Sequence, residues 1–312
     1  MEGNYTIAKV MDILDLENCD ISIRGKLTWN DDIQYWLKNI IGLTYAQRST
    51  AWRLGNSNQN GRPISLTLWK AEESDVCREH LHNSDVSFRH TFAAYSENIT
   101  MTNLDVNATS NSQWSTVNTD GFDSWNSKDI AVKNWVLTCG DDCISIKGNS
   151  SNIHVHNVTC HESGAMCIGS LGNLASTPDY QYIAPTPPGS RRYPGQGHVC
   201  NVTFRNINFV DVNQPIYVSP CIYSYSNCDG SRLKISHVTW ENITGTSRYN
   251  VAAGIYCSKQ TPCTGFKFKN INIKPKNGGA SKVLCSNMNS DSRLACTGTC
   301  PAGWEQQLSG NA

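Results

Sequence analysis

The sequence predicts an all-β chain that winds as a β-solenoid, and three observations lead to this fold class. Short segments with alternating apolar and polar residues recur along the chain. These segments are rich in β-branched and aromatic residues, which favour strands. No helical periodicity separates them, so stacked coils of short strands account for the pattern.

Six segments show the strand pattern, and each is followed by a turn at Asn, Asp or Gly. They are residues 98–106, 129–137, 152–160, 201–209, 233–241 and 266–273. Successive starts are separated by about 20–35 residues, as in a solenoid, except that the interval between the third and fourth has room for two coils. Since stacked strands lie about 4.8 Å apart, we expect inward ladders of Ile, Val and Leu, with Asn residues repeating at the turns.

An antiparallel β-sandwich also contains many short strands, and it is the alternative fold. Its hairpins would need Asn-Gly or Asp-Gly turns between adjacent strands, but Asn60-Gly61 and Asp229-Gly230 do not lie between clean alternating runs. The solenoid is therefore favoured, and we expect a single domain over residues 1–312. Within it, we expect an irregular N-terminal segment and a loop at the proline-rich residues 173–197.

The composition limits the classes of partner. The formal net charge is zero and only 17% of residues are charged, so we expect neither nucleic acid nor a membrane surface as partner. No apolar run approaches the roughly 20 residues that span a bilayer. The 14 cysteines include no Cys-x-x-Cys pair, which favours disulfides over a metal site.

Seven Asn-x-Ser/Thr sequons agree with the oxidising compartment in which disulfides form. They lie at Asn4, Asn98, Asn107, Asn149, Asn157, Asn201 and Asn242. We therefore expect a secreted, extracellular protein. The first residues, Met1–Tyr5, have no charged start followed by an apolar stretch, so they do not form a signal peptide.

Two acidic segments carry the candidate chemistry. Asp120 lies in the first, and Asp141 and Asp142 follow in the second, at a separation close to the length of a minimal coil. This spacing would stack three carboxylates on one wall, where like charges raise the pKa of at least one. A protonated acid beside ionised carboxylates suits glycosidic cleavage. Calcium binding and plain polar turns remain open from these residues alone.

Three stretches contain these carboxylates or follow them closely in the sequence: Asn118–Asp123, Gly140–Cys143 and Ile168–Gly172. Together they resemble the signatures of glycoside hydrolase family 28, the polygalacturonases and their relatives. Upstream, residues 32–36 and 49–52 resemble the fungal exo-acting members. The central part of the resemblance is highly specific, and its whole extent covers most of the chain.

This resemblance implies a right-handed parallel β-helix, the single-stranded pectin-lyase-like solenoid, and inverting hydrolysis of α-galacturonosyl bonds in pectin. It implies that Asp141 is the general acid, and that Asp120 and Asp142 hold and activate water. Asn118 matches a supporting polar residue of the first signature. The substrate would be a pectic polysaccharide, polygalacturonate, and we expect a monomer with no organic cofactor and no catalytic metal.

The resemblance also implies a disulfide between Cys143 and Cys160 beside the site, which would pin adjacent coils and help fix the carboxylates. Gly164 occupies the position at which endo-acting members carry a histidine, and this favours exo action.

The Arg-Ile-Lys segment that binds the substrate carboxylate in the family is absent here. Arg191 and Arg192 are the candidate cations in its place. Tyr223 lies near the position of a tyrosine that contacts the sugar.

The sequence thus predicts a secreted exo-polygalacturonase. Rhamnogalacturonan hydrolysis is the alternative among enzymes, because relatives that cleave that polymer also lack the histidine. A catalytically decayed β-solenoid that binds wall polysaccharide is the alternative of another class, and the missing Arg-Ile-Lys segment supports it.

Overall fold

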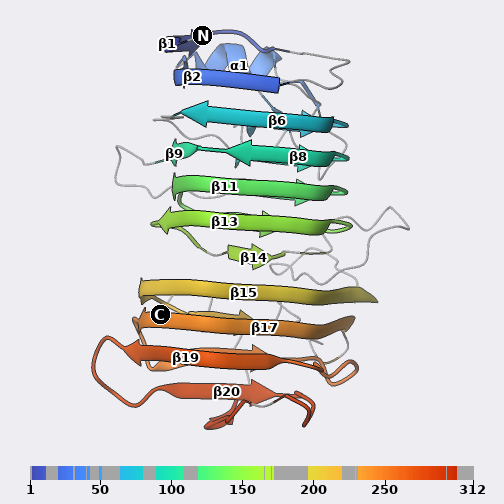
Figure 1. Cartoon of the computed structure of the whole chain (residues 1–312), viewed down its shortest axis with the longest axis vertical. Coiled ribbons are helices and arrows are strands. Elements are labelled where there is room, and N and C mark those ends of the chain that lie inside the picture. Colours follow the sequence, from blue (N-terminus) through green and yellow to red (C-terminus); the bar gives the residue numbers. More distant parts are fainter. Residues whose placement is uncertain are drawn as a thin grey trace. The chain divides into compact units, whose positions relative to one another are not determined.

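A computed structural model describes most of the chain, and it divides into two compact units, Met1–Gly169 and Ser170–Ala312. The described residues are 2–11, 20–30, 32–39, 41–42, 49–50, 64–79, 89–108, 119–164, 166–169, 171, 196–219, 229, 231–292 and 294–300. Each unit is built from stacked strands that pair in parallel, as a solenoid requires (Figure 1).

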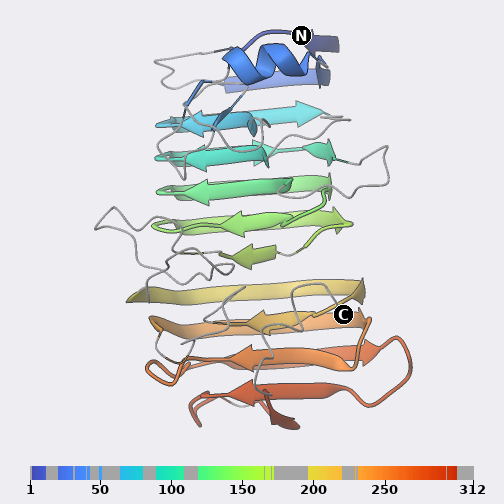
Figure 2. The ribbon, with the colours of Figure 1, turned by 180° about the vertical axis from the view of Figure 1, so that it is seen from behind.

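The first unit contains two sheets that share successive coils. The first sheet has the order β1 (Glu2–Ile7), β2 (Asp20–Trp29), β6 (Glu72–Glu79), β8 (Glu97–Thr102), β11 (Lys128–Thr138) and β13 (Ser151–His161), with β9 (Asp105–Asn107) also on β11. The second has the order β14 (Met166–Ile168), β12 (Ile144–Ile146), β10 (Asp120–Trp125), β7 (Arg89–Ala94), β5 (Ile64–Trp69), β4 (Ser49–Thr50) and β3 (Ile41–Gly42). Figure 2 shows this unit from behind.

Among the described strands of this unit, only β3 and β4 pair antiparallel. A short helix, α1 (Ile33–Asn39), lies in the N-terminal segment, where the sequence predicted irregular structure. Asp32 caps it, because the Asp32 Oδ1 atom accepts a hydrogen bond of 2.9 Å from the backbone N–H of Tyr35. A helix of this length is too short to give a clear helical periodicity in the sequence.

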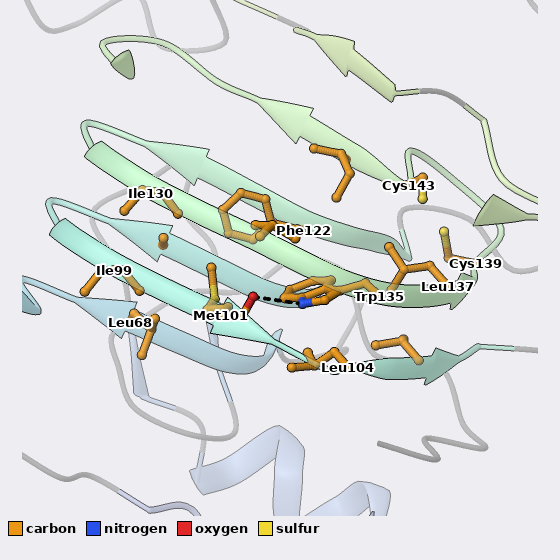
Figure 3. Close-up of a cluster of buried hydrophobic side chains, with 14 residues drawn as sticks. Leu68, Ile99, Met101, Leu104, Phe122, Ile130, Trp135, Leu137, Cys139 and Cys143 are labelled. Carbon is orange, nitrogen blue, oxygen red and sulfur yellow. Dashed lines mark hydrogen bonds between the residues drawn. The ribbon is translucent and has the colours of Figure 1, made fainter. Parts of the chain in front are cut away.

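The register of the first unit confirms two predicted coil lengths. Ile99 pairs with Ile130, and Ile130 pairs with Ile153. Each of the three is the second residue of its predicted segment, so these segments align start to start. Figure 3 shows the core that these ladders build together with Met101, Trp135 and other apolar side chains. The inward ladders are therefore as predicted, and each such side chain stabilises the fold by about 1.5–3 kcal/mol.

The second unit also has two parallel sheets, and its register differs from the predicted spacing. One sheet has the order β15 (Gln196–Val212), β17 (Arg232–Ser247) and β19 (Lys267–Pro275), and the other β16 (Ile216–Val218), β18 (Val251–Tyr256), β20 (Lys282–Ser286) and β21 (Gly298–Thr299). Phe204 pairs with Trp240 and Trp240 with Phe268. The predicted segments therefore do not align by their first residues: the first of these two coils is longer than predicted, and the second is shorter.

Aromatic stacking accounts for this register. The ring of Trp240 lies 5.9 Å from that of Phe204 and 4.8 Å from that of Phe268, with interplanar angles of 15° and 3°. Trp240 is buried, so the stack lies in the core of the second unit. Stacked pairs add to the free energy of burying the rings, so they favour the observed register.

Asparagine columns run along the stacked coils. The sequence predicted that they would lie at turns, but Asn134 and Asn157 lie within strands β11 and β13, at positions where φ is positive. Asn134 donates a hydrogen bond of 3.2 Å to Asn103, and Asn157 donates one of 2.9 Å to Asn134. All three have φ between 54° and 58°, a left-handed conformation that Asn tolerates better than most residues. In the second unit, Asn206, Asn242 and Asn270 form a hydrogen-bonded column of the same kind.

Candidate active site

The two acidic segments meet because β10 and β12 are neighbours in the second sheet of the first unit. Phe122 pairs with Ile144 across this ladder. Just before it, the backbone N–H of Gly121 donates to the carbonyl of Asp142 over 2.9 Å. Asp120 therefore lies beside the turn that carries Asp141 and Asp142, one coil away, as their spacing in the sequence predicted.

Gly121 permits this close approach of the two coils. A Cβ atom at this position would lie 2.6 Å from the carbonyl oxygen of Cys143 and 2.7 Å from a methyl carbon of Leu137. Gly121 lies inside strand β10, so the Asp120-Gly121 pair is not a plain turn. The glycine is needed because the neighbouring backbone occupies the space of a side chain.

The turn with the acidic pair is held from both neighbouring coils. Gly164, on the next coil, donates its N–H to the carbonyl of Asp141 over 2.8 Å. The predicted disulfide between Cys143 and Cys160 is present, with its Cα atoms 6.0 Å apart. A Cβ atom at Gly164 would lie 3.2 Å from Asp142 Oδ1, so this position is in direct contact with the acidic pair.

The electrostatics agree with the prediction that crowded carboxylates raise a pKa. The pKa of Asp142 is raised from 3.8 to about 6, mainly by burial, and the charges of Asp120 and Asp141 act in the same direction. Lys147 and a hydrogen bond from the thiol of Cys167 act in the opposite direction. Repulsion between carboxylates was the cause expected from the sequence, but loss of solvation is the larger cause.

Lys147 is a part of the site that the sequence analysis did not single out. It is buried, and its Nζ lies 3.5 Å from Asp123 Oδ1 and 3.8 Å from Asp120 Oδ2. It donates hydrogen bonds to Ser145 Oγ over 2.6 Å and to the Gly169 carbonyl over 2.8 Å. The alternation in Ile144-Ser-Ile-Lys could have revealed that Ser145 and Lys147 share one face.

His90, in the neighbouring strand β7, is a second titratable group that the sequence analysis did not name. It is buried, and burial lowers its pKa to about 4 while the charge of Asp120 acts in the opposite direction. At neutral pH this imidazole is therefore uncharged. No pattern in the sequence distinguishes it from the other histidines of the chain.

Four predicted binding residues lie outside the described part of the chain: Asn118, Arg191, Arg192 and Tyr223. Within the described part, no group of three or more His, Cys, Asp or Glu side chains could hold a metal ion. The described residues contain no helix long and apolar enough to cross a membrane.

Comparisons with known proteins place the chain in a family. The model of glycosyl hydrolases family 28 matches residues 41–184 and 190–296. An Aspergillus flavus protein named as a putative galacturan 1,4-alpha-galacturonidase A is 29% identical, over 87% of this chain and 80% of its own. An exopolygalacturonase of Cochliobolus carbonum is 27% identical, over 94% of this chain and 78% of its own.

A solved structure has the same fold. The endo-xylogalacturonan hydrolase of Aspergillus tubingensis superposes with a TM-score of 0.69 at 20% identity, over 96% of this chain and 90% of that one. This similarity confirms the predicted right-handed parallel β-helix. Since the family model covers most of the residues of both units, the chain belongs to glycosyl hydrolases family 28.

Proposed function

We propose that this chain is a secreted exo-polygalacturonase, which releases galacturonic acid from the ends of polygalacturonate chains with inversion. Membership of family 28 supports hydrolysis of a pectic polysaccharide. The relatives named as a galacturonidase and an exopolygalacturonase support action at chain ends. The disulfide pairs of the chain agree with secretion, and a monomer suffices because the acidic residues all lie in one chain.

One observation carries the proposed mechanism: Asp120 lies against the turn of Asp141 and Asp142 in consecutive coils. Asp141 donates a proton to the glycosidic oxygen as its bond to the anomeric carbon breaks. Water attacks that carbon from the opposite face and gives its proton to the carboxylates of Asp120 and Asp142. A pKa of about 6 for Asp142 makes this carboxylate an effective base near neutral pH.

Four further residues belong to the proposal through their chemistry. Arg191 and Arg192 would bind the carboxylate of the terminal sugar, because a guanidinium matches a carboxylate with two hydrogen bonds. Asn118 and Tyr223 would contact hydroxyl groups of the sugar. Charge reversal at the two arginines should therefore raise KM far more than it lowers kcat.

The test compares the expressed chain with Asp141→Asn on polygalacturonate. We expect release of galacturonic acid alone, with inverted anomeric configuration by proton NMR, and a loss of about 100- to 10,000-fold in kcat on substitution. Equal, near-zero rates for both proteins would favour a decayed, polysaccharide-binding solenoid. Product from rhamnogalacturonan but not from polygalacturonate would favour the other enzyme, for which the exposed backbone of Gly164 beside Asp142 is the supporting observation.

A further inference from the structure

Lys147 lies among the carboxylates of the proposed site, and its side chain is buried. Its side chain is 5% exposed, and that of Asp123 is not exposed at all. A buried ammonium is costly unless carboxylates and hydrogen bonds compensate it. Lys147 has both, so its charge is fixed in position rather than free to move to the surface.

The hydrogen bonds of Lys147 define where this charge lies. An ammonium has three N–H groups, and two of them are directed to Ser145 Oγ and to the carbonyl of Gly169. The remaining N–H is available to the acidic side chains of β10, Asp123 at 3.5 Å and Asp120 at 3.8 Å. Lys147 is therefore anchored to Ser145 of β12 and to Gly169, which follows β14, and it is directed toward β10.

A second connection leads from Lys147 to Asp142. Ser145 accepts the hydrogen bond of Lys147 and lies 3.3 Å from the sulfur of Cys167. The thiol of Cys167 in turn donates to Asp142 Oδ2 over 3.3 Å. Displacing the ammonium would thus disturb Asp120 directly and Asp142 through two intermediate side chains.

We propose that Lys147 is a positioning residue of this hydrolase, which keeps Asp120 and Asp142 in the ionised form that activates water while it does not contact the sugar. This inference rests on the proposed function, since it assigns these two carboxylates to the base side of the reaction. The charge of Lys147 then offsets the loss of solvation that the water-activating carboxylates experience.

The titratable groups around Lys147 determine the direction of the expected change. They are Asp120 and Asp123 from β10, Asp141 and Asp142 from the turn before β12, Cys167 from β14 and His90 from β7. His90 has a pKa of about 4 and burial raises the pKa of the Cys167 thiol well above its usual value, so both are neutral between pH 5 and 8. Lys147 is the cation of this described set.

Removal of that cation should raise the pKa of Asp142, because the charge of Lys147 lowers it. A base with a higher pKa loses its charge at a higher pH, so the acidic limb of the pH profile should move upward. An opposite charge at this range typically lowers a carboxyl pKa by about 1–3 units. We therefore expect the acidic limb of kcat/KM to move up by about one pH unit or more.

The experiment uses pairs of variants that separate this effect from a structural one. Lys147→Met alone removes the ammonium that compensates the buried charge of Asp123 and could unfold the protein. Asp123→Asn and the double variant Asp123→Asn/Lys147→Met differ only at position 147, and neither retains the Asp123 charge. Lys147→Arg keeps the positive charge in a different shape.

We expect the double variant to have a Tm close to that of Asp123→Asn. Its acidic limb should lie at higher pH than that of Asp123→Asn. Its kcat/KM on polygalacturonate at pH 5 should be about 10- to 100-fold lower than that of Asp123→Asn, which is the loss that such a shift produces. Lys147→Arg should keep the acidic limb near that of the native chain. If the double variant keeps both the rate and the acidic limb of Asp123→Asn, Lys147 serves only to neutralise Asp123, and the proposal is wrong.

Failure of the proposed function would be visible separately, as absence of hydrolysis by the native chain on every pectic polymer. In that case, carbon NMR titration of the Asp142 carboxyl in the same two proteins still measures the effect of Lys147. An equal Asp142 pKa in both would refute the electrostatic role without reference to activity.

Discussion

Protonation of His90 should destabilise the folded protein at acidic pH. The unfolded chain binds a proton at this imidazole near pH 6.5, whereas burial lowers the folded pKa to about 4. The unfolded state therefore binds more protons between these values, and the stability that neutral His90 provides is lost as the pH falls. Integration between pH 6.5 and 4 gives a loss of about 2.5 kcal/mol in the free energy of unfolding.

Asp142 should act in the opposite direction over nearly the same range. Its pKa is raised from 3.8 to about 6, so here the folded state binds more protons than the unfolded state. Its contribution to stability is fully present below pH 3.8 and is lost as the pH rises through 6. The change is about 2 kcal/mol at most, because the side chain is half-buried and solvent screens part of it.

These two contributions nearly cancel in the native chain, and single substitutions should separate them. Urea unfolding at pH 6.5 and pH 4 is the measurement. His90→Gln should gain about 2.5 kcal/mol at pH 4 relative to the native chain, after subtraction of the difference at pH 6.5. Asp142→Asn should lose up to about 2 kcal/mol on the same scale.

His154→Gln is the matched control, because His154 is exposed on β13. It should change the pH dependence of the free energy of unfolding by less than about 0.5 kcal/mol. If His90→Gln showed the same pH dependence as the native chain, the premise that burial excludes the proton from His90 would be refuted. The same result for Asp142→Asn would refute the raised pKa on which the proposed base depends.

Substitutions at three further positions test the packing around the site and in the two units. Gly164→Ala places a Cβ atom 3.2 Å from Asp142 Oδ1, so kcat should fall about 10-fold or more while urea unfolding changes by less than about 1 kcal/mol. Asn134→Ala should lower the free energy of unfolding by about 1–2 kcal/mol, because two side-chain hydrogen bonds are lost and alanine must adopt a positive φ. Asn134→Gly should lower it less, because glycine adopts a positive φ without strain. Trp240→Ala should cost about 3–5 kcal/mol in thermal or urea unfolding, and Trp240→Phe clearly less.

The predictable parts of the fold are those that consecutive coils repeat. Residues 98–106, 129–137 and 152–160 share one alternating pattern, and their register in β8, β11 and β13 follows it directly. The register of β15, β17 and β19 was not predictable in this way. There the longer strands offer several alternating alignments, and the stacking of Phe204, Trp240 and Phe268 selects among them.

The site was predictable to the same extent. In the register of β10 and β12, Phe122 pairs with Ile144, so one coil leads from Asp120 to Asp142, and Asp141 lies one residue short of it. The sequence spacing of the two acidic segments therefore brings their backbones side by side. Lys147 was not predictable, because Ile144-Ser-Ile-Lys is also the pattern of a strand with one solvated face. Two features distinguish Lys147: its face of the strand is buried, and Asp123 lies close to it on the neighbouring strand β10. Neither feature can be recognised from the segment Ile144–Lys147 alone.

The position of the acidic pair is determined by the backbone of three consecutive coils. The carbonyl of Asp142 accepts a hydrogen bond from Gly121 on the coil before, and that of Asp141 accepts one from Gly164 on the coil after. Both donors are glycines at which a larger residue would meet neighbouring atoms. A change of one residue in the length of the coil between Asp120 and Asp141 would shift the backbone that these hydrogen bonds align. The coil length, and not the side chains alone, therefore specifies the proposed site.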